Sequence, residues 1–545
     1  MKPYQIKRIE RAGLAVIMLA AVVLRFAGLR WGIPNEAHLF SYHPDEAPIL
    51  GASWYMLITG DWDPHFYNYG TCYVYLIAAV AKGGAVMGFI PLPKGGWAEL
   101  HLIARFLTAL MGAATVYLVY SIGKSLGGVP VGFGAAALMA ILPAHVVNSH
   151  YATVDVPATF FIALLFVILL RFFGRAELGW YLVAGLALGL AAATKYTVGL
   201  ALITLIIAHF YASDEYGESP SILYLLAAVF VAVLAFFAVT PYLLVMTPEG
   251  FRLNPDLVRD VRFEMEHMRV GGTFAFANAG LGWIYHLLRS LPAAMGYVAL
   301  AFGLVGAVLM IQRGGPVALV LFSFALPYFV LVGAGKEMFL RYMVPLLTVL
   351  AVSAAYALER LREASVPKLG KWGAVVAPAL LGAACIFLTA WYAVQMVGIM
   401  MAPDVRTRAA NWLRPQLTST ADVGLASTPW YFTPPITTFN GGLRSAADFR
   451  RWQEEDAPYR VTVIGWDAAA LRQERPDYFI VSDAEYADLL RLQREDAVGL
   501  MDALPKTYRR IEVFEPPPPL PALRPDKLAC PPDWLYTWPR IEVHY

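Results

Sequence analysis

Cysteine and charge are both scarce in this 545-residue chain. Only three cysteines occur, and Cys72, Cys385 and Cys530 are too scattered for a disulfide framework or a cysteine metal cage. Charged residues make up 15% of the chain, and its net charge of +2 is too small to indicate a nucleic-acid-binding surface. Apolar residues, in contrast, make up 58% of the chain, and the mean hydropathy of +0.55 is typical of a membrane protein.

Long apolar runs recur from the N-terminus to about residue 400. Most approach the roughly 20 residues that an α-helix needs to cross a bilayer, so we predict a polytopic α-helical membrane protein with about eleven spans. The basic start of the chain resembles a signal peptide, but no small-residue cleavage site follows it, so we expect an uncleaved first span. The predicted spans are residues 12–30, 101–123, 130–148, 157–173, 178–194, 196–211, 221–245, 291–311, 316–333, 341–358 and 373–399.

The composition changes after residue 400, where Pro, Asp, Arg and Trp become frequent. No later run is long enough to span a bilayer. Short stretches rich in β-branched and aromatic residues predict strands, and apolar residues at helical spacing predict a helix over 483–504. We therefore expect residues 401–545 to form a separate, water-soluble α/β domain. The predicted strands are residues 421–427, 459–466, 476–483 and 508–515.

One apolar run, residues 69–90, is ambiguous because Lys82, Gly83 and Gly84 interrupt it. If this run crosses the membrane, every basic loop after it faces outward while the N-terminus stays inside. If it does not cross, the basic short loops gather on the cytoplasmic side, as the positive-inside rule requires. We therefore expect it to lie along or dip into the outer interface, within one long external loop over 31–100. The basic residues then on the cytoplasmic side are Lys2, Lys7, Arg8, Arg11, Lys124, Arg171, Arg175, Arg313, Arg360, Arg362, Lys368 and Lys371.

This topology makes residues 1–400 the membrane domain, with the N-terminus in the cytoplasm. The C-terminal domain is then extracytoplasmic, outside a plasma membrane, and a second external loop covers residues 246–290. Polar motifs that were not used to choose the topology fall on the same outer face. They are "HPDE" at 43–46, "HYATVDVP" at 150–157, "TKYT" at 194–197, "RFEMEHMRVGG" in the second external loop, and "GKEMFLRYMVP" at 335–345.

Three carboxylates and two fixed cations stand out in these motifs. Asp45, Glu46 and Asp155 can act as a general base toward a hydroxyl group or as oxygen ligands for a divalent cation. Lys195 and Arg341 suit a phosphate, arginine through a bidentate fork and lysine as a point charge. Transfer from a lipid-linked phosphate donor requires both kinds of group, because a base deprotonates the acceptor while cations stabilise the departing phosphate.

Each of these residues also has a structural explanation. Asp45 can cap the helix predicted to begin near Ala47, with Glu46 in its first turn, and Asp155 can cap the next span. Lys195 can simply extend its side chain from a helix end toward the interface.

The second external loop and the segment before Arg341 have similar alternatives. Lys336, Glu337 and Arg341 can form an ion-pair group at the interface. His267, which follows Glu264 and Glu266 in sequence, can be a solvated histidine. The arrival of all motifs on one face is therefore a stronger signal than any single residue.

The order of these motifs resembles the GT-C superfamily of polytopic glycosyltransferases that use polyprenyl-phosphate sugars. It is most similar to the branch of protein O-mannosyltransferases and lipid A aminoarabinose transferases. Asp45 and Glu46 match the family's acidic pair in the first external loop, and Asp155 matches its second acidic position. "TKYT" carries the matching lysine, Lys195, and "RYMVP" resembles the Arg-Tyr-X-X-Pro helix start at Arg341. The resemblance covers the membrane domain.

The resemblance implies inverting transfer, in which the acceptor attacks the anomeric carbon from the face opposite the lipid phosphate. By analogy, Asp45 would be the general base or would orient the acceptor, with Glu46 beside it. Asp155 would position the acceptor or a metal, and Lys195 and Arg341 would hold the donor phosphate.

The resemblance also implies secondary contacts with the substrate. Tyr196 would join the donor-phosphate site, and His267 would close the external loop over the donor. Further contacts are expected from His43, Tyr69 and Lys336. No cofactor is assigned, and a divalent cation is left open.

The resulting prediction is an integral plasma-membrane glycosyltransferase that moves a sugar from a polyprenyl-phosphate donor to a protein, lipid or cell-surface glycan. Its implied partners are the donor, membrane lipid and the acceptor, with no nucleic acid. The main alternative is a transporter, whose charges would lie near the bilayer midplane within an inverted repeat, whereas here they cluster at one face. A second alternative is a non-catalytic protein that handles lipid-linked glycans through its external domain.

Overall fold

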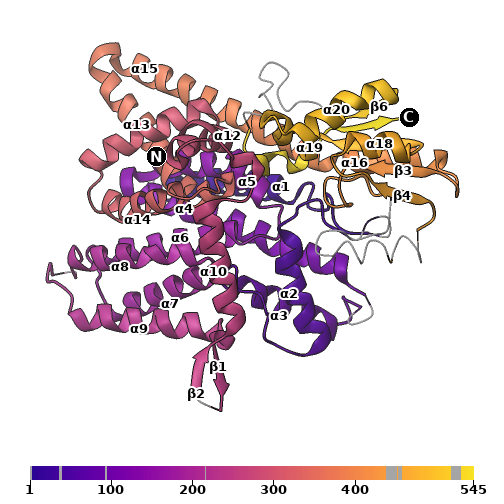
Figure 1. Cartoon of the computed structure of the whole chain (residues 1–545). Helices are drawn as coiled ribbons and strands as arrows, with labels where there is room; N and C mark the ends of the chain where they lie inside the picture. The colour runs from indigo at the N-terminus through magenta and orange to yellow at the C-terminus, as the bar shows by residue number, and fades with distance from the viewer. Residues whose placement is uncertain are drawn as a thin grey trace.

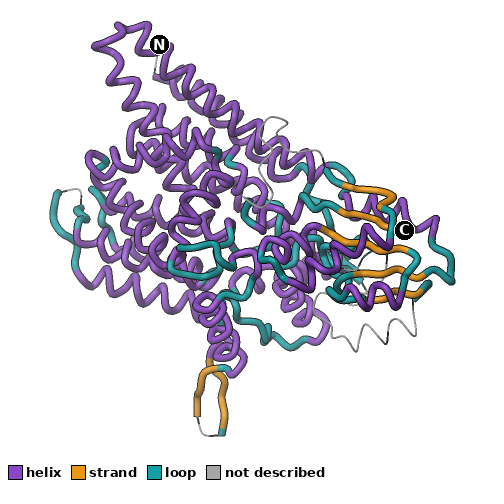
Figure 2. The backbone as a smooth tube through the Cα atoms, turned by 45° about the horizontal axis from the view of Figure 1, so that its top comes forward, coloured by secondary structure: helices purple, strands orange, loops and turns teal. Residues whose placement is uncertain are grey.

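The computed structural model consists of a large helical body and a smaller sheet domain (Figure 1). It describes residues 3–35, 38, 40–91, 95–214, 216–248, 250–436, 451, 457–516 and 530–545. The helices pack beside one another, and the sheet domain lies to one side of them together with the C-terminus (Figure 2). The predicted combination of a helical domain with a separate C-terminal α/β domain is therefore present.

The helical body runs from α1 to α15, and a β-hairpin between α9 and α10 protrudes from it (Figure 1). The hairpin is formed by β1 (Leu244–Thr247) and β2 (Gly250–Leu253), which pair antiparallel. The helices are α1 (Pro3–Phe26), α2 (Glu46–Thr59), α3 (Cys72–Val86), α4 (Trp97–Ile141), α5 (Pro143–Asn148), α6 (Asp155–Leu169), α7 (Leu178–Thr194), α8 (Ala201–Phe210), α9 (Ile222–Ala238), α10 (Pro255–Val270), α11 (Gly282–Tyr285), α12 (Leu291–Met295), α13 (Tyr297–Arg313), α14 (Gly315–Gly333) and α15 (Val344–Met401).

The long helix α4 consists of two helical halves that turn back on each other. Gly127 and Gly128 have non-helical backbone angles, and Gly128 takes a positive φ of 72° that favours glycine. A Cβ built on Gly132 would lie only 3.0 Å from the carbonyl oxygen of Tyr120, so the two halves approach closely. The predicted separation of spans 101–123 and 130–148 therefore corresponds to this glycine turn. Two parts of α15 also come into contact, since a Cβ on Gly382 would lie 3.8 Å from Leu358 Cδ1.

Small residues also allow α7 and α9 to pack closely. Gly185 and Gly189 lie four residues apart on α7 and face Ala228 and Ala232 on α9. A Cβ at either glycine would collide with the carbonyl oxygen of the facing alanine. This small-x-x-x-small pattern is the usual way that helices approach closely in a membrane. The packing fixes the end of α7, where Lys195 follows.

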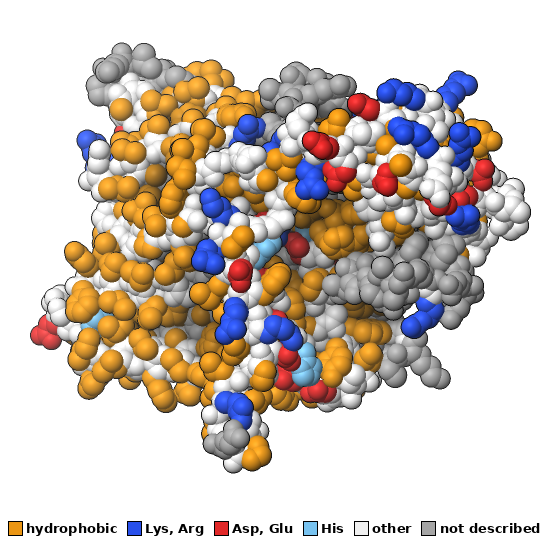
Figure 3. All heavy atoms as spheres, viewed as in Figure 1, with side chains coloured by type: hydrophobic (Ala, Val, Ile, Leu, Met, Phe, Trp, Pro, Cys, Tyr) orange, Lys and Arg blue, Asp and Glu red, His pale blue; other side chains and the backbone are white. Residues whose placement is uncertain are grey.

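The helical body has the apolar surface expected of a multi-pass membrane protein. Among the described residues, five helices are long and apolar enough to cross a bilayer, or six if α11–α12 and α13, bent by 117°, form one span. The outer side of α9 is strongly apolar, and Figure 3 shows apolar atoms across the face that α7, α8 and α9 form. The number of eleven spans, the orientation of the termini and the plasma membrane stay predictions. The five helical segments are Trp97–Ile141, Asp155–Phe172, Gly315–Gly333, Leu340–Ser365 and Pro378–Gln416.

The ambiguous run at 69–90 forms the short helix α3. Its 15 residues extend about 22 Å, less than the roughly 30 Å of a bilayer core. The helix continues through Gly83 and Gly84, which together with Lys82 interrupt the apolar run in the sequence. Lys82 places its ammonium group 4.6 Å from the ring centre of Trp62 rather than in a helix break. The length of α3 agrees with a segment that does not cross.

The sheet domain contains a five-stranded mixed sheet in the order β4-β3-β5-β7-β6. The four predicted strands are all present, and β3 pairs parallel with both β4 and β5. A fifth strand, β7 (Ile541–His544), was not predicted and pairs antiparallel with β5 and β6. The other strands are β3 (Asp422–Leu425), β4 (Arg460–Val463), β5 (Tyr478–Ser482) and β6 (Arg510–Phe514).

The helices of the sheet domain are shorter than predicted. The helix expected over 483–504 is divided into α19 (Asp483–Arg491) and α20 (Glu495–Thr507), because Gln493 takes a positive φ of 53°. The described part of the domain also contains α16 (Val405–Leu413) and α18 (Ala468–Glu474). Ser482 caps α19 in a capping box with Glu485, which explains why this helix begins directly after β5.

The last part of the chain connects the two domains. Before β7, the chain forms the short 3₁₀-helix η10 (Pro532–Thr537). Trp534 is 2% exposed and belongs, with Tyr536, to the apolar core of the helical body rather than to the core of the sheet domain. This segment therefore packs with the helical body, although it lies after the predicted domain boundary near residue 400.

Candidate active site

Four predicted site residues meet where several helices begin or end. Asp45 precedes α2, Asp155 begins α6, Lys195 follows α7, and Arg341 lies in the 3₁₀-helix η6 (Leu340–Met343) before α15. They form two ion pairs, with Arg341 Nη2 3.1 Å from Asp45 Oδ2 and Lys195 Nζ 2.6 Å from Asp155 Oδ1. Figure 3 shows a hollow between the helical body and the sheet domain in which acidic and histidine atoms are visible.

Tyr342 joins the two ion pairs. The Lys195 ammonium lies 4.8 Å from the centre of its ring, and the Arg341 guanidinium lies 5.6 Å from the same ring. Arg341 also lies 3.9 Å from the ring centre of Phe339, so an aromatic face supports its planar group. The sequence predicted the two cations but not the aromatic residues that hold them.

Asp45 occupies the helix-cap position of α2 but does not cap the helix. Its side chain makes no capping hydrogen bond, and 25% of it is exposed. Oδ2 is buried and has no hydrogen-bond partner within the protein, although Arg341 is close. The other three charged side chains of the two pairs are only 3–8% exposed. Asp45 is therefore the carboxylate of this group that a substrate reaches most easily.

Glu46 is buried and held by several donors. The guanidinium of Arg105 donates to both carboxylate oxygens at 2.7 Å, the Ala152 N–H donates at 2.7 Å, and the Ser41 hydroxyl donates as well. Burial opposes its ionisation, but the charge of Arg105 prevails and lowers the pKa of Glu46 to about 2. The geometry favours a structural role for Glu46, which ties the loop carrying Asp45 to α4, and its predicted catalytic role is not carried further.

Asp155 and Lys195 form a pair in the interior of the protein. Their side chains are 3% and 8% exposed, so Lys195 does not extend to the surface as the alternative explanation required. Nearby, a Cβ at Gly70 would collide with the carbonyl oxygen of Ala193, which shows how closely the segment between α2 and α3 approaches the end of α7. The segment thereby comes next to the lysine.

Tyr69, Tyr196 and His43 are brought toward the same region. Burial, followed by the charge of Asp45, raises the pKa of the Tyr69 hydroxyl. The Tyr196 hydroxyl is buried without a hydrogen-bond partner in the protein. His43 is 2% exposed, and its ring centre lies 4.0 Å from that of Tyr151. Burial lowers the pKa of His43 to about 4, so the ring is neutral at pH 7.

His267 and Lys336 lie in a second group of contacts. His267 Nε2 is 3.7 Å from Glu337 Oε1, which also accepts hydrogen bonds from the Gly272 and Thr273 N–H groups at 2.6 and 3.0 Å. The Lys336 N–H donates to the Met268 carbonyl oxygen at 2.8 Å, while its side chain is exposed. These bonds fasten the end of α10 to the segment before Arg341. The ion-pair group predicted for Lys336, Glu337 and Arg341 is not formed, because Arg341 pairs with Asp45.

Sequence reasoning did not identify the contribution of the C-terminal segment. Asp533 accepts hydrogen bonds from the Leu340 and Arg341 N–H groups at 3.0 and 2.9 Å. The Tyr536 ring lies 4.9 Å from that of His43. The only sequence signal was an aromatic cluster, "DWLYTW" at 533–538, directly before the end of the chain.

Several buried polar atoms of the site have no hydrogen-bond partner within the protein. They are Arg341 Nη1, His43 Nδ1 and the Tyr151 hydroxyl, besides Asp45 Oδ2 and the Tyr196 hydroxyl described above. Buried polar atoms in native proteins nearly always have partners, so a cluster of unpaired ones indicates a place where a polar ligand binds. Within the described ranges, no group of three or more His, Cys, Asp or Glu side chains could hold a metal ion. A divalent cation stays a sequence-based prediction.

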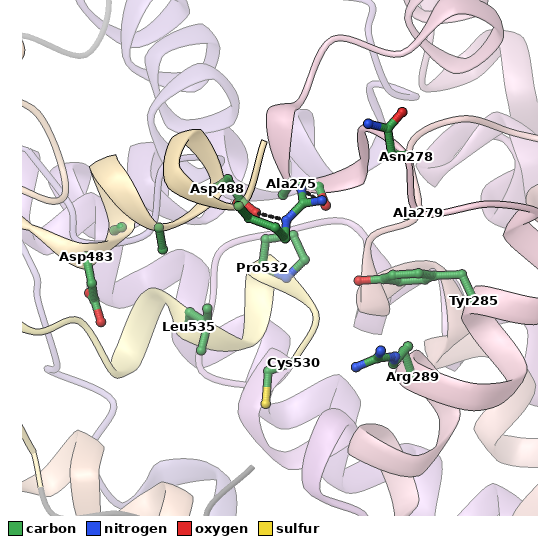
Figure 4. Close-up of a pocket in the computed structure, with 13 residues that line it drawn as sticks. Ala275, Asn278, Ala279, Tyr285, Arg289, Asp483, Asp488, Cys530, Pro532 and Leu535 are labelled. Carbon is green, nitrogen blue, oxygen red and sulfur yellow. Dashed lines mark hydrogen bonds and ion pairs between the residues drawn. The ribbon is translucent and has the colours of Figure 1, made fainter. Parts of the chain in front are cut away.

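A separate cavity lies between the helical body and the sheet domain (Figure 4). It measures about 290 Å³, and Tyr285 and Arg289 of the helical body face Asp488 of α19 across it. Arg491 fastens the two domains at its edge, since its guanidinium donates to the Phe274 carbonyl oxygen at 2.8 Å. Pro532 and Leu535 also line this cavity, so η10 separates it from Arg341.

Comparisons with known proteins identify the fold. Residues 99–249 match the family model described as dolichyl-phosphate-mannose-protein mannosyltransferase. The oligosaccharyltransferase of Archaeoglobus fulgidus, tethered with an acceptor peptide, superposes with a TM-score of 0.54 at 15% identity, covering 94% of this chain and 73% of that chain. A complex of the same enzyme, AglB, with an inhibitory peptide and a dolichol-phosphate gives a TM-score of 0.53 at 15% identity, with the same coverage.

ArnT from Cupriavidus metallidurans bound to undecaprenyl phosphate gives a TM-score of 0.48 at 15% identity, covering 88% of this chain and 94% of that chain. No curated protein matches the chain. Residues 99–249 are therefore similar to a domain of the protein mannosyltransferase family, and the chain has the fold of GT-C glycosyltransferases such as the Archaeoglobus fulgidus oligosaccharyltransferase. The resemblance predicted from the sequence is confirmed at this level.

Proposed function

We propose that this protein is a membrane glycosyltransferase that moves a sugar from a polyprenyl-phosphate donor to an acceptor on the outer face of the plasma membrane, with inversion at the anomeric carbon. The observation that carries the proposal is the pairing of two carboxylates with two cations at one place, Asp45 with Arg341 and Asp155 with Lys195. A sugar phosphate needs both kinds of group within reach.

The two cations are suited to the donor phosphate. Arg341 has a buried nitrogen without a hydrogen bond, and Lys195 uses only one of its three N–H groups on Asp155. Both can therefore donate to phosphate oxygens without first losing their carboxylate partners. As the bond between the anomeric carbon and the phosphate oxygen breaks, the extra negative charge forms on the departing polyprenyl phosphate, beside these cations.

Asp45 is the proposed general base because its side chain is the most exposed of the four. It accepts the proton of the attacking hydroxyl or amide group while the acceptor forms the new bond to the anomeric carbon. The proposed role of Asp155 is to orient the side chain of Lys195. His43 is neutral at pH 7 and, with Tyr69, would contact substrate without contributing charge. Tyr196, His267 and Lys336 stay candidates for donor contacts.

The comparisons direct the choice of substrates to test. The matching family model is named for dolichyl-phosphate mannose and protein acceptors, and AglB was solved with a dolichol-phosphate and with acceptor peptide. We therefore select polyprenyl-phosphate mannose as the first donor and protein as the first acceptor. Other polyprenyl-phosphate sugars, and lipid or glycan acceptors, form the rest of the panel.

Sugar transfer by the purified protein in lipid tests the proposal. Wild type, Asp45→Asn and Lys195→Ala are compared at equal folded fraction, with Glu266→Gln, an exposed carboxylate of α10, as the matched control. We expect turnover in wild type and the control and a loss of at least about 100-fold in the two site variants. If wild type consumes no donor across the panel, or if both site variants are fully active, the proposal is wrong and the transporter alternative moves ahead.

A further inference from the structure

The C-terminal segment supplies a carboxylate to the candidate active site. β7 lies inside the sheet, between β5 and β6, and this position returns the preceding residues to the helical body. Trp534 anchors the segment there, since it is 2% exposed and its Nε1 donates to the Tyr392 hydroxyl at 2.7 Å. Asp533 is the preceding residue and is 8% exposed.

Asp533 holds the turn that carries Arg341. η6 begins after Phe339, whose side chain offers no oxygen for capping, so the first N–H groups of the turn need an external acceptor. Asp533 supplies it, because Oδ1 accepts from Leu340 and Oδ2 accepts from Arg341. Asp533 Oδ2 also lies 3.8 Å from Arg341 Nη1. One carboxylate thus contacts both the backbone and the guanidinium of the arginine.

The guanidinium of Arg341 is consequently placed between two carboxylates. Nη2 is 3.1 Å from Asp45 Oδ2, but neither this oxygen nor Nη1 makes a hydrogen bond. A free arginine and aspartate normally close into a bidentate pair with two hydrogen bonds. The Arg105–Glu46 pair shows this closed form, with two contacts of 2.7 Å. The Arg341–Asp45 pair is open by comparison.

We propose that Asp533 is a positioning residue that keeps the Arg341–Asp45 pair open, so that Arg341 stays available to the donor phosphate and Asp45 to the acceptor. This inference rests on the proposed transfer function and deepens it. It makes the η10 segment, which leads into the last strand of the sheet domain, part of the active site. Without the Asp533 carboxylate, Arg341 turns fully onto Asp45, and both groups are withdrawn from the substrate.

The test compares the binding of polyprenyl phosphate with that of the same polyprenol without phosphate. The ratio of the two affinities reports the phosphate contact of the cations and removes the contribution of the lipid chain. In Asp533→Asn, at equal folded fraction, we expect this ratio to fall by about five- to tenfold and kcat to fall by about tenfold. Trp534→Phe is the control, because it weakens the same segment and leaves Asp533 in place. Trp534→Phe should lower thermal stability, while the affinity ratio and kcat both stay within about twofold of the wild-type values.

A double-mutant cycle separates positioning from a general loss of structure. In an Asp45→Asn background, Arg341 has no carboxylate on which to close, so adding Asp533→Asn should leave the affinity ratio unchanged. An equal fall of the ratio in both backgrounds would overturn the proposal, as would an unchanged ratio and kcat in the single variant. If Asp533→Asn does not fold, Asp533→Ser carries the same prediction, because its hydroxyl still accepts one of the two backbone N–H groups.

The outcomes distinguish this inference from the proposed function. If wild type binds polyprenol and polyprenyl phosphate equally, the phosphate site itself is wrong. If wild type prefers the phosphate and Asp533→Asn retains both that preference and full turnover, only the positioning role is wrong.

Discussion

Asp45 and Glu46 are neighbours in sequence but occupy opposite kinds of environment. Glu46 is fully buried and forms a closed pair with Arg105, whereas Asp45 keeps a quarter of its side chain exposed and faces Arg341 without a hydrogen bond. Successive residues of a helix point about 100° apart, so one carboxylate faces α4 and the other faces η6. A closed pair stabilises the loop, and an open pair leaves its groups free for chemistry.

The closed pair should be the one whose loss costs most stability. Arg105→Ala leaves Glu46 buried without its counter-charge, and we expect the free energy of unfolding to fall by about 3–5 kcal/mol. Thermal and chemical unfolding in detergent measure this change. Arg460→Ala removes an arginine that is 61% exposed and should change the same quantity by less than about 1 kcal/mol. Equal effects of the two variants would contradict the comparison.

Substitution in the open pair should have the opposite consequence, which is a large effect on turnover and a small effect on stability. We expect Asp45→Asn to lower kcat by about 10²–10⁴-fold and the free energy of unfolding by less than about 1 kcal/mol. Glu46→Gln should lower stability by about 1–3 kcal/mol while kcat per folded molecule stays within about tenfold. Paired kinetic and unfolding measurements check both. If Glu46→Gln loses as much kcat as Asp45→Asn, Glu46 has a catalytic role after all.

The difference in stability between wild type and Glu46→Gln, which lacks the charged carboxylate, should depend on pH. The pKa of Glu46 is lowered from 4.5 to about 2, so its contribution to stability is fully present above pH 4.5 and is lost as the pH falls toward 2. The stability difference between wild type and Glu46→Gln should therefore be constant from pH 7 to 5 and shrink below pH 4.5. Melting temperatures across this range measure it. A difference that grows on acidification would have the wrong sign.

An exposed ion pair provides the smallest effect in the series. His65 Nδ1 lies 2.7 Å from Asp256 Oδ2 and Nε2 lies 3.3 Å from Asp61 Oδ2. The contact with Asp256 joins the segment between α2 and α3 to α10. The hydrogen bond that the His65 ring donates to the Asp256 carboxylate raises the pKa of His65, so the contact stabilises below pH 6.5 and is lost as the pH rises through the raised value. Because His65 is 45% exposed, we expect less than about 1 kcal/mol.

Hydrogen exchange of the α10 amides measures the His65 contact. Exchange should accelerate as the pH rises from 6 to 9 in wild type, beyond the intrinsic chemical increase. His65→Gln should lack this extra acceleration. An extra acceleration of the same size in His65→Gln would assign the effect to another group.

Much of the fold could be predicted because its signals are local. Apolar runs longer than 15 residues predicted α6, α7, α9 and α14, and alternating β-branched residues predicted four strands of the sheet. β7 was missed because "IEVH" is too short to be recognised, and its partners lie far away in sequence. The division of the helix over 483–504 was missed because no glycine or proline marks Gln493, where the backbone takes a positive φ.

The sequence predicted which residues belong to the candidate site, but not which of them form ion pairs with each other. Charged residues beside apolar runs identified Asp45, Asp155, Lys195 and Arg341 as unusual. Nothing local indicated that Asp155 would face Lys195, 40 residues later, or that Asp533 would reach Arg341 from the far end of the chain. Arg105 was overlooked because it lies within an apolar run.

The amino-acid sequence by itself determined which segments become helices and strands, where the apolar surface lies and which ionisable residues stand at helix ends. These properties depend on side chains within one or two turns of each other. Only the tertiary structure decided that Glu46 is buried and Asp45 is not, and that the segment before the last strand brings a carboxylate to the arginine of the site. Burial and pairing of charges depend on elements that meet from distant parts of the chain, and a single residue of helical rotation changes both.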